Sequence, residues 1–279
     1  MPERTTDTAL LFPGQGSQEP GMRDVVAEYR PDLLELAREL VGTDPFDRVD
    51  EGTRFTQPAI YCAALAGWER LGRPDAAYAA GHSLGEVAAL AAAGAVGEEE
   101  GLRVAVERGA LMQRAADTGN GGMVALLGER AEAVRLADAF EVTVANDNAP
   151  DQLVVAGSLE RLDDLRREAR PAGLRALRLA VRGAFHSPEM EPAVAGFRAA
   201  LREVEFTEPR FPVVSCATAE EFAAPRAELA DALVRPVRWR QTLGALRDRG
   251  VERFVETGPG EVLTKLVTRN LGEAVAGHA

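Results

Sequence analysis

Three residue types are scarce in this chain of 279 residues, which contains two cysteines, three histidines and a single lysine, Lys265. Cys62 and Cys216 lie far apart and form no Cys-x-x-Cys pair, which disfavours a metal or redox site and predicts buried free thiols. The formal net charge of −12 argues against a nucleic acid partner, because binding a polyanion requires a basic surface.

Long hydrophobic runs are also missing. No apolar segment approaches the roughly 18 residues of a membrane span, and residues 1–7 lack the basic and apolar regions of a signal peptide. We therefore expect a cytoplasmic protein without a membrane partner. Because 46% of the residues are hydrophobic, the chain can bury a large core, either as one domain or as a large domain with a small one.

The stretch Gly81-His82-Ser83-Leu84-Gly85 joins a short apolar run to an alanine-rich helical run. Gly-x-Ser-x-Gly fits a nucleophile elbow, a turn between strand and helix so sharp that only glycines fit around a strained serine. Such a serine lies at the N-terminus of the next helix, where backbone N–H groups receive a developing negative charge. An ordinary tight turn is the alternative, since the pattern also occurs by chance.

A serine nucleophile needs a general base, and histidine is the usual one. His278 lies next to the C-terminus, and His82 precedes Ser83 on the turn, so its side chain is expected to point away from Ser83. His186 is therefore the candidate base. The alternative is a structural, hydrogen-bonded histidine.

Arg108 lies in the apolar stripe of a helix expected over residues 98–117, between Val104 and Leu111. A buried arginine keeps its charge and needs an anionic partner. Two partners are possible: a carboxylate elsewhere in the fold, or a substrate carboxylate bound by both arms of the guanidinium.

Strands and helices alternate along most of the chain. A strand over 8–12 leads into a Gly-rich loop that lacks the motifs of nucleotide-binding loops, and helices are expected over 22–40, with a break at Pro31, and over 57–71. After glycines at 119–122, a β-α-β-β-α-β order is ferredoxin-like, with strands over 123–127, 142–145, 153–157 and 174–181 and a turn over 146–151. We predict an α/β fold in which residues 1–120 and 187–279 form a mostly parallel, doubly wound, hydrolase-like sheet, and residues 121–186 form an inserted ferredoxin-like subdomain.

The chain resembles malonyl-CoA:acyl-carrier-protein transacylases and the acyltransferase domains of polyketide synthases over nearly its whole length. The resemblance rests on five motifs in the same order: Leu11-Phe12-Pro13-Gly14-Gln15-Gly16-Ser17-Gln18, Gly81-His82-Ser83-Leu84-Gly85-Glu86, Arg108-Gly109-Ala110-Leu111-Met112-Gln113, Ala184-Phe185-His186-Ser187 and Glu256-Thr257-Gly258-Pro259-Gly260.

The resemblance implies a ping-pong malonyltransferase in which Ser83 accepts the malonyl group from coenzyme A and His186 activates first Ser83 and then the pantetheine thiol of an acyl carrier protein. It assigns the oxyanion hole to the backbone N–H groups of Gln15 and Leu84. Arg108 would pair with the free carboxylate of malonate. No metal and no cofactor beyond the coenzyme A thioester are implied, and we expect a monomer.

Further positions refine this expectation. Asn148 and His82 match the substrate side of the site, although Asn148 could equally cap a turn. Phe185 stands where the family has Phe with malonyl and Ser with methylmalonyl, which predicts malonyl. Because the family's carrier is acidic, we expect it to dock between two arginine clusters: Arg235, Arg238, Arg240, Arg247 and Arg249, and Arg166, Arg167 and Arg170.

The sequence also departs from the family. The Gln whose backbone carbonyl usually orients the catalytic histidine is absent before Pro236, and Ser215-Cys216-Ala217 replaces an Asn pair. Three other functions remain open: transfer of another extender or acyl unit in a polyketide pathway, a serine thioesterase or hydrolase, and a non-catalytic carrier-binding protein.

Overall fold

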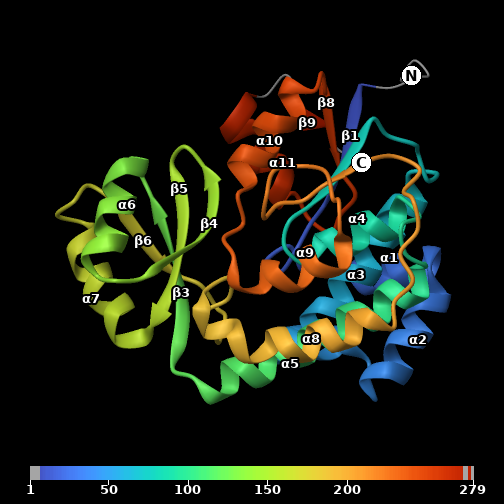
Figure 1. The fold of residues 1–279 in the computed structure, drawn as a ribbon, viewed down its shortest axis with the longest axis horizontal. Coiled ribbons are helices and arrows are strands. Elements are labelled where there is room, and N and C mark those ends of the chain that lie inside the picture. The colour runs from blue at the N-terminus through green and yellow to red at the C-terminus, as the bar shows by residue number, and fades with distance from the viewer. Residues whose placement is uncertain (1–6, 273–275, 278–279) are drawn as a thin grey trace.

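The computed structural model describes residues 7–272 and 276–277, in which two sheets organise the chain (Figure 1). The larger sheet is parallel, with the strand order β7-β2-β1-β8-β9. Its strands are β1 (Thr8–Phe12), β2 (Tyr78–Gly81), β7 (Val213–Val214), β8 (Arg253–Glu256) and β9 (Ala276–Gly277). Parallel pairing brings the carboxyl ends of β1, β2 and β8 to one edge, where ligands bind in open α/β sheets.

Side chains of the central strand β1 alternate between two hydrophobic cores. Leu10 and Phe12 belong to the core that includes α3, α4 and α5, whereas Ala9 and Leu11 belong to the core with α10 and α11. Helices therefore cover both faces, and the predicted doubly wound architecture is confirmed. These helices are α1 (Met22–Tyr29), α2 (Pro31–Val41), α3 (Thr53–Arg70), α4 (Gly85–Ala92), α5 (Glu98–Thr118), α8 (Glu191–Arg202), α9 (Pro225–Asp231), α10 (Trp239–Asp248) and α11 (Val262–Leu271), with 3-10 turns η1 (Pro45–Glu51), η2 (Pro188–Met190) and η3 (Ala232–Val234).

One helix prediction needs correction and one is confirmed. The helix expected over 57–71 begins at Thr53, because Pro58 is accommodated inside α3 and does not mark its first turn. The break expected at Pro31 within residues 22–40 is confirmed, since Pro31 opens a second helix, where its missing N–H costs no hydrogen bond. Helix α9, which also begins with a proline, was not predicted.

The smaller sheet is antiparallel, with the order β4-β5-β3-β6, and the β-α-β-β-α-β connectivity is the predicted ferredoxin-like one. Val124 and Val155 face its two helices, whereas Met123 and Ala156, on the opposite face, join the core of the larger sheet. The smaller sheet is therefore packed onto the larger part. This sheet and the two helices on it form the smaller part of the molecule, which consists of β3 (Gly121–Leu127), α6 (Arg130–Ala139), β4 (Thr143–Ala149), β5 (Gln152–Ser158), α7 (Leu159–Ala169) and β6 (Arg175–Arg178).

The turn predicted over 146–151 is wrong. Strand β4 continues to Ala149, and the turn is confined to Pro150 and Asp151. The Asn-rich composition suggested a turn, but Asn146 forms a bridge to Val237 of the larger part, a partner that lies 91 positions away in the sequence. Strand β6 is also shorter than the predicted span of 174–181.

Among the described residues, no helix has the length and apolar composition needed to cross a membrane. The two ends of the predicted large domain, residues 1–6 and 278–279, lie outside the described residues, and so does His278.

Candidate active site

Ser83 lies on a sharp turn between β2 and α4, with a left-handed φ of 55°. A Cβ on Gly81 would lie 1.9 Å from the backbone carbon of Gly85, and a Cβ on Gly85 would lie 2.0 Å from the carbonyl oxygen of Phe12. Both positions therefore require glycine. The turn has the shape of a nucleophile elbow, with a strained serine at the N-terminus of a helix.

His186 is hydrogen-bonded to Ser83, with 2.7 Å between Nε2 and the serine Oγ. Its other ring nitrogen, Nδ1, lies 3.0 Å from the carbonyl oxygen of Ala232 and 3.1 Å from that of Arg235. Carbonyl oxygens only accept hydrogen bonds, so Nδ1 carries the proton and Nε2 is free to accept the serine proton. Two main-chain carbonyls thus occupy the place of a triad carboxylate, in the segment where the family's Gln is missing.

The environment of His186 keeps its ring neutral. The side chain is buried, and this burial, together with the charge of Arg108, lowers the pKa of His186 to about 3. A neutral imidazole is the form that can accept a proton.

Arg108 is buried on α5, 3% exposed, and points at the same hydroxyl. Its Nη2 donates to Ser83 Oγ at 3.1 Å and its Nη1 donates to Gln57 Oε1 at 2.9 Å. Among the described residues, no carboxylate oxygen lies within 4.0 Å of its nitrogens. Burial accordingly lowers the pKa of Arg108 to about 10. The structure therefore gives Arg108 no direct ion pair. The buried Glu86 carboxyl acts on it only from beyond 4.0 Å and offsets part of the effect of burial, and the cation faces the serine.

Gln57 is a site residue that the sequence analysis missed. It lies on α3, is 2% exposed, and its Nε2 donates to Thr53 Oγ1 at 2.7 Å while its Oε1 accepts from Arg108. Gln57 therefore orients the guanidinium. The available signal was a single amide directly before the largely apolar run 58–68 of α3.

These groups line a cavity between the two sheets, with a volume of about 80 Å³. The loop after β1 closes one side, and Gly14 packs so closely that a Cβ there would lie 2.3 Å from the His82 carbonyl oxygen. Among the described residues, no acceptor is bonded to the backbone N–H of Gln15 or Leu84, so both are free for an oxyanion. Apolar lining comes from Met112, Met123, Leu179, Val181 and Phe185.

His82 and Asn148 contact each other. His82 Nε2 lies 3.0 Å from Asn148 Oδ1, and the His82 ring packs against Trp239. His82 lines the cavity together with Asn146, another residue that the sequence analysis missed, whereas Asn148 does not. The Oδ1 atom of Asn146 is buried and has no hydrogen-bond partner among the described residues. A substrate role for Asn148 and His82 stays a prediction.

The segment that replaces the Asn pair lies beneath the elbow. Glu86 is buried and accepts hydrogen bonds from Ser215 Oγ at 2.9 Å and from the Cys216 N–H at 2.7 Å. Cys216 Sγ lies 3.4 Å from the backbone nitrogen of Ser83. Both Cys216 and Cys62 are buried free thiols, as predicted. This segment supports the turn from below and does not line the cavity.

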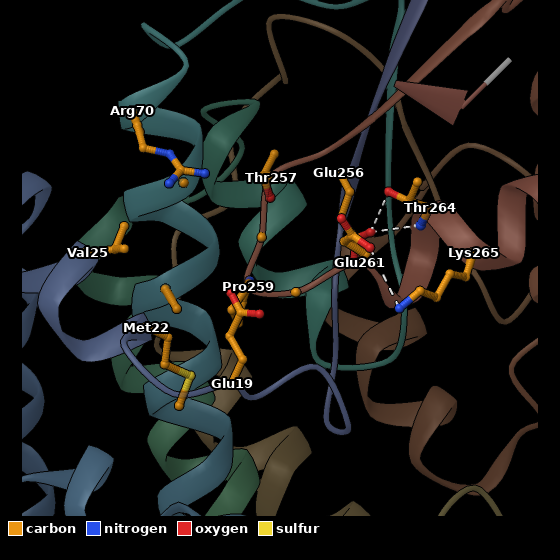
Figure 2. A pocket seen from close by; sticks show the side chains of 14 residues that line it. Glu19, Met22, Val25, Arg70, Glu256, Thr257, Pro259, Glu261, Thr264 and Lys265 are labelled. Carbon is orange, nitrogen blue, oxygen red and sulfur yellow. Dashed lines mark hydrogen bonds and ion pairs between the residues drawn. The ribbon is translucent and has the colours of Figure 1, made fainter. Parts of the chain in front are cut away.

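The motif Glu256-Thr257-Gly258-Pro259-Gly260 lies at a different cavity of about 330 Å³ (Figure 2). Glu256 accepts hydrogen bonds from the N–H groups of Leu263 and Thr264 and thereby caps α11. Thr257 packs against α3 so tightly that a Cβ on Gly67 would lie 1.5 Å from its carbonyl oxygen. The contacts of this motif are those of a structural support at the ends of β8 and β1.

Known proteins are similar to this chain in both sequence and fold. The family model described as "Acyl transferase domain" matches residues 38–278. The polyketide biosynthesis protein ThaF of Burkholderia thailandensis is 39% identical over 94% of this chain, which spans 24% of that longer protein. The malonyl CoA-acyl carrier protein transacylase of Salmonella typhimurium is 35% identical, with 95% of this chain and 93% of the relative covered.

Among solved structures, a malonyl-transacylase in complex with a type II polyketide synthase acyl-carrier protein superimposes with a TM-score of 0.89 at 33% identity. The superposition covers 98% of this chain and 95% of that one. The family match covers well over half of this chain, and the Salmonella relative matches nearly end to end. The chain therefore belongs to the acyl transferase domain family.

Proposed function

We propose that this protein transfers a malonyl group from coenzyme A, through an ester on Ser83, to the pantetheine thiol of an acyl carrier protein. The observation that carries the proposal is that one hydroxyl contacts two groups: Ser83 Oγ is hydrogen-bonded to a neutral base, His186, and to a buried cation, Arg108, that pairs directly with no carboxylate of the described residues. A base activates the serine, and the cation selects an acyl group that ends in a carboxylate.

In the first half-reaction, His186 Nε2 takes the hydroxyl proton while Ser83 Oγ attacks the thioester carbonyl carbon. The negative charge that develops on the carbonyl oxygen is stabilised by the N–H groups of Gln15 and Leu84. The tetrahedral intermediate then collapses, the carbon–sulfur bond breaks, and His186 returns its proton to the departing coenzyme A sulfur. Malonyl-Ser83 remains.

In the second half-reaction, His186 takes the proton of the carrier's pantetheine thiol, and the sulfur attacks the Ser83 ester. Collapse of this intermediate returns the proton to Ser83 and releases the malonyl thioester of the carrier. Arg108 holds the malonate carboxylate through both halves. Each step uses groups of the chain and its two substrates, the coenzyme A thioester and the carrier thiol, so the proposed cycle includes no cofactor.

Carrier recognition is proposed from the relatives, one of which was solved with an acyl-carrier protein. The two arginine clusters expected to dock the carrier are partly neutralised by the chain's own carboxylates. Arg240 pairs with Asp147 at 2.9 Å, and Arg166 pairs with Asp163 at 3.2 Å. Charge reversal at Arg166 and Arg167, and separately at Arg238, would test this docking hypothesis through the KM for the carrier.

A cytoplasmic location and a monomeric state also stay proposals. The location is supported by the two unpaired cysteines, because free thiols persist in reducing compartments.

Radiolabelled malonyl-CoA tests the proposed function directly. We expect one malonyl group to bind covalently per chain, to persist in water, and to move to an added carrier. A Ser83→Ala variant should show no labelling, whereas Ser158→Ala, which alters the cap of α7, should label normally. Rapid release of malonate to water would instead indicate a hydrolase. Absence of labelling in the parent protein would indicate a carrier-binding protein without catalysis.

A further inference from the structure

A buried carboxylate, Asp147, lies where the two sheets meet. It is on β4 of the smaller sheet and is 4% exposed. Arg130, from helix α6, which packs on the same sheet, pairs with it at 3.1 Å. Arg240, from the first turn of α10 in the larger part, reaches it with Nη2 at 2.9 Å and Nε at 3.1 Å. Asp147 thus joins one cation from each side of the junction.

The backbone repeats this connection. The Val237 N–H donates to the Ala145 carbonyl at 2.8 Å, and the Asp147 N–H donates to the Val237 carbonyl at 2.8 Å. Val237 is therefore bridged in parallel to Asn146 at the outer edge of the smaller sheet. Figure 1 shows β4 as the strand of that sheet beside α10.

The segment that carries Val237 and Arg240 also carries both partners of His186 Nδ1. The carbonyl of Arg235 is two residues before Val237, and that of Ala232 belongs to the preceding turn, η3. These two carbonyls fix the tautomer and the ring orientation of the base. Whatever holds this segment in place therefore also holds His186.

We infer that Asp147 is a positioning residue for His186: through Arg240 and the Val237 backbone, it clamps residues 232–240 so that the Ala232 and Arg235 carbonyls stay on Nδ1. The hydrogen bond to Asp147, outweighing the cost of burial, raises the pKa of Arg240 and keeps this cation charged. The inference rests on the proposed function only where it concerns rate.

Other contacts keep the smaller sheet docked when Arg240 is changed. Asn148 is bonded to His82, its carbonyl accepts from Asn270 Nδ2 at 2.9 Å, and Asp151 pairs with Arg269 at 2.7 Å. Removing the Arg240 arm should therefore loosen the 232–240 segment without separating the two sheets.

The two arginines of Asp147 form a matched pair of variants. Arg240→Gln removes the ion pair that connects Asp147 to the segment whose carbonyls bind His186. Arg130→Gln removes an ion pair that connects Asp147 only to α6, within the smaller part of the molecule. We expect Arg240→Gln to slow malonylation of Ser83 about tenfold in single turnovers, with KM for malonyl-CoA unchanged, because small misplacements of a reacting group cost up to about 100-fold. Arg130→Gln should change the rate less than twofold, and Asp147→Glu should retain most of it.

A spectrum of the unreacted protein separates positioning from simple loss of stability. The chain has three histidines, so the Nδ1–H signal of His186 can be assigned in ¹⁵N-labelled protein. We expect this signal to broaden and exchange faster with water in Arg240→Gln, and to be unchanged in Arg130→Gln. Urea midpoints of both variants show whether their folds are equally intact.

Equal effects of the two substitutions on rate and spectrum, or an unaltered Nδ1–H signal in Arg240→Gln, would overturn the inference. Failure of the parent protein to form malonyl-Ser83 would overturn the proposed function instead, and the spectrum would still decide on the positioning of His186.

Discussion

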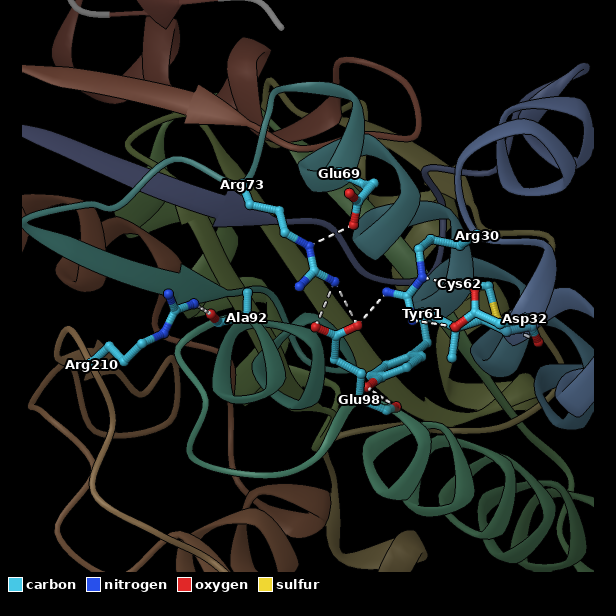
Figure 3. Close-up of polar contacts among 10 residues, drawn as sticks. Arg30, Asp32, Tyr61, Cys62, Glu69, Arg73, Ala92, Glu98 and Arg210 are labelled. Atoms are coloured by element: carbon cyan, nitrogen blue, oxygen red, sulfur yellow. Dashed lines mark hydrogen bonds and ion pairs between the residues drawn. The ribbon is translucent and has the colours of Figure 1, made fainter.

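Two buried arginines, Arg30 and Arg108, show how differently this fold treats the same charge. Arg30, at the start of α2, is 8% exposed, and its guanidinium is shared between two carboxylates (Figure 3). It binds Asp32 at 2.6 Å and also contacts Glu98, which in turn pairs with Arg73 at 2.9 Å. Arg108 is 3% exposed, and its hydrogen-bond partners are the neutral groups Gln57 and Ser83.

The pKa values of the two residues follow from their partners. Burial alone would lower the pKa of Arg30, but the hydrogen bond to Asp32 and the charge of Glu98 outweigh it, and the pKa lies above its usual value. At Arg108, burial dominates, and the pKa falls to about 10. The charge of Arg30 is balanced by carboxylates of the fold itself. The charge of Arg108 is buried without a direct ion pair, and a substrate carboxylate would stabilise it.

The largest test of this comparison is the replacement of Arg108. Arg108→Gln should lower kcat/KM for malonyl-CoA about 10³-fold, because the malonate carboxylate would lose its charged, two-armed partner. Acetyl-CoA, which has no carboxylate, should be affected far less, so the malonyl-to-acetyl preference should collapse.

Arg30→Gln is the matched control, since it removes another buried guanidinium from a different part of the larger domain. It should leave the malonyl-to-acetyl ratio of kcat/KM unchanged. A ratio that survives in Arg108→Gln would show that Arg108 does not select the carboxylate.

The second test compares the stabilities of the same two variants, and here the larger effect is expected for Arg30→Gln. Arg30→Gln should lower the free energy of unfolding by about 1–2 kcal/mol, because Asp32 would lose its hydrogen-bonded cation while Glu98 keeps its pair with Arg73. Arg108→Gln should change it less or raise it, since that substitution removes a buried charge that pairs directly with no carboxylate of the described residues. Urea denaturation monitored by circular dichroism measures both values. Equal losses of stability in the two variants would contradict the proposed difference between Arg30 and Arg108.

The sequence predicted those site residues that a short motif, a helical pattern or the composition identifies. Ser83 was indicated by glycines within two positions of it, Arg108 by its place in a helical stripe, and His186 by the scarcity of histidine. The alternation of strands and helices also predicted both sheets. In each case the decisive information lies within one turn, one helix or the composition of the chain.

Contacts between distant segments could not be predicted. The Ala232 carbonyl lies 46 positions from His186, and Gln57 lies 51 positions from Arg108. The second half of strand β4 was mistaken for a turn because its edge pairs with Val237, and no local propensity encodes a partner so far along the chain. The sequence identified the reacting groups but not the groups that orient them.

The third test asks whether the charge of Arg108 acts on its neighbour, His186. With a pKa of about 3, His186 should stay neutral between pH 5 and pH 8, and its ring signals should not titrate over this range in NMR spectra. A histidine at the ordinary value of about 6.5 would be protonated roughly 30:1 at pH 5. In Arg108→Gln the pKa of His186 should rise, because part of the electrostatic repulsion is lost. Ordinary titration of His186 in the parent protein would contradict the proposed coupling.

The smallest effect is expected at Phe185, whose buried ring lines the same cavity as Arg108. Malonyl and methylmalonyl groups carry the same carboxylate, so we expect Arg108 not to distinguish them and Phe185 to set the choice. Phe185→Ser should raise methylmalonyl relative to malonyl transfer about tenfold, since one methyl group is worth about 1–3 kcal/mol. Phe185→Leu keeps most of the bulk and should change the ratio less. If Phe185→Ser leaves the ratio of the two kcat/KM values unaltered, Phe185 does not set the choice between the two acyl groups.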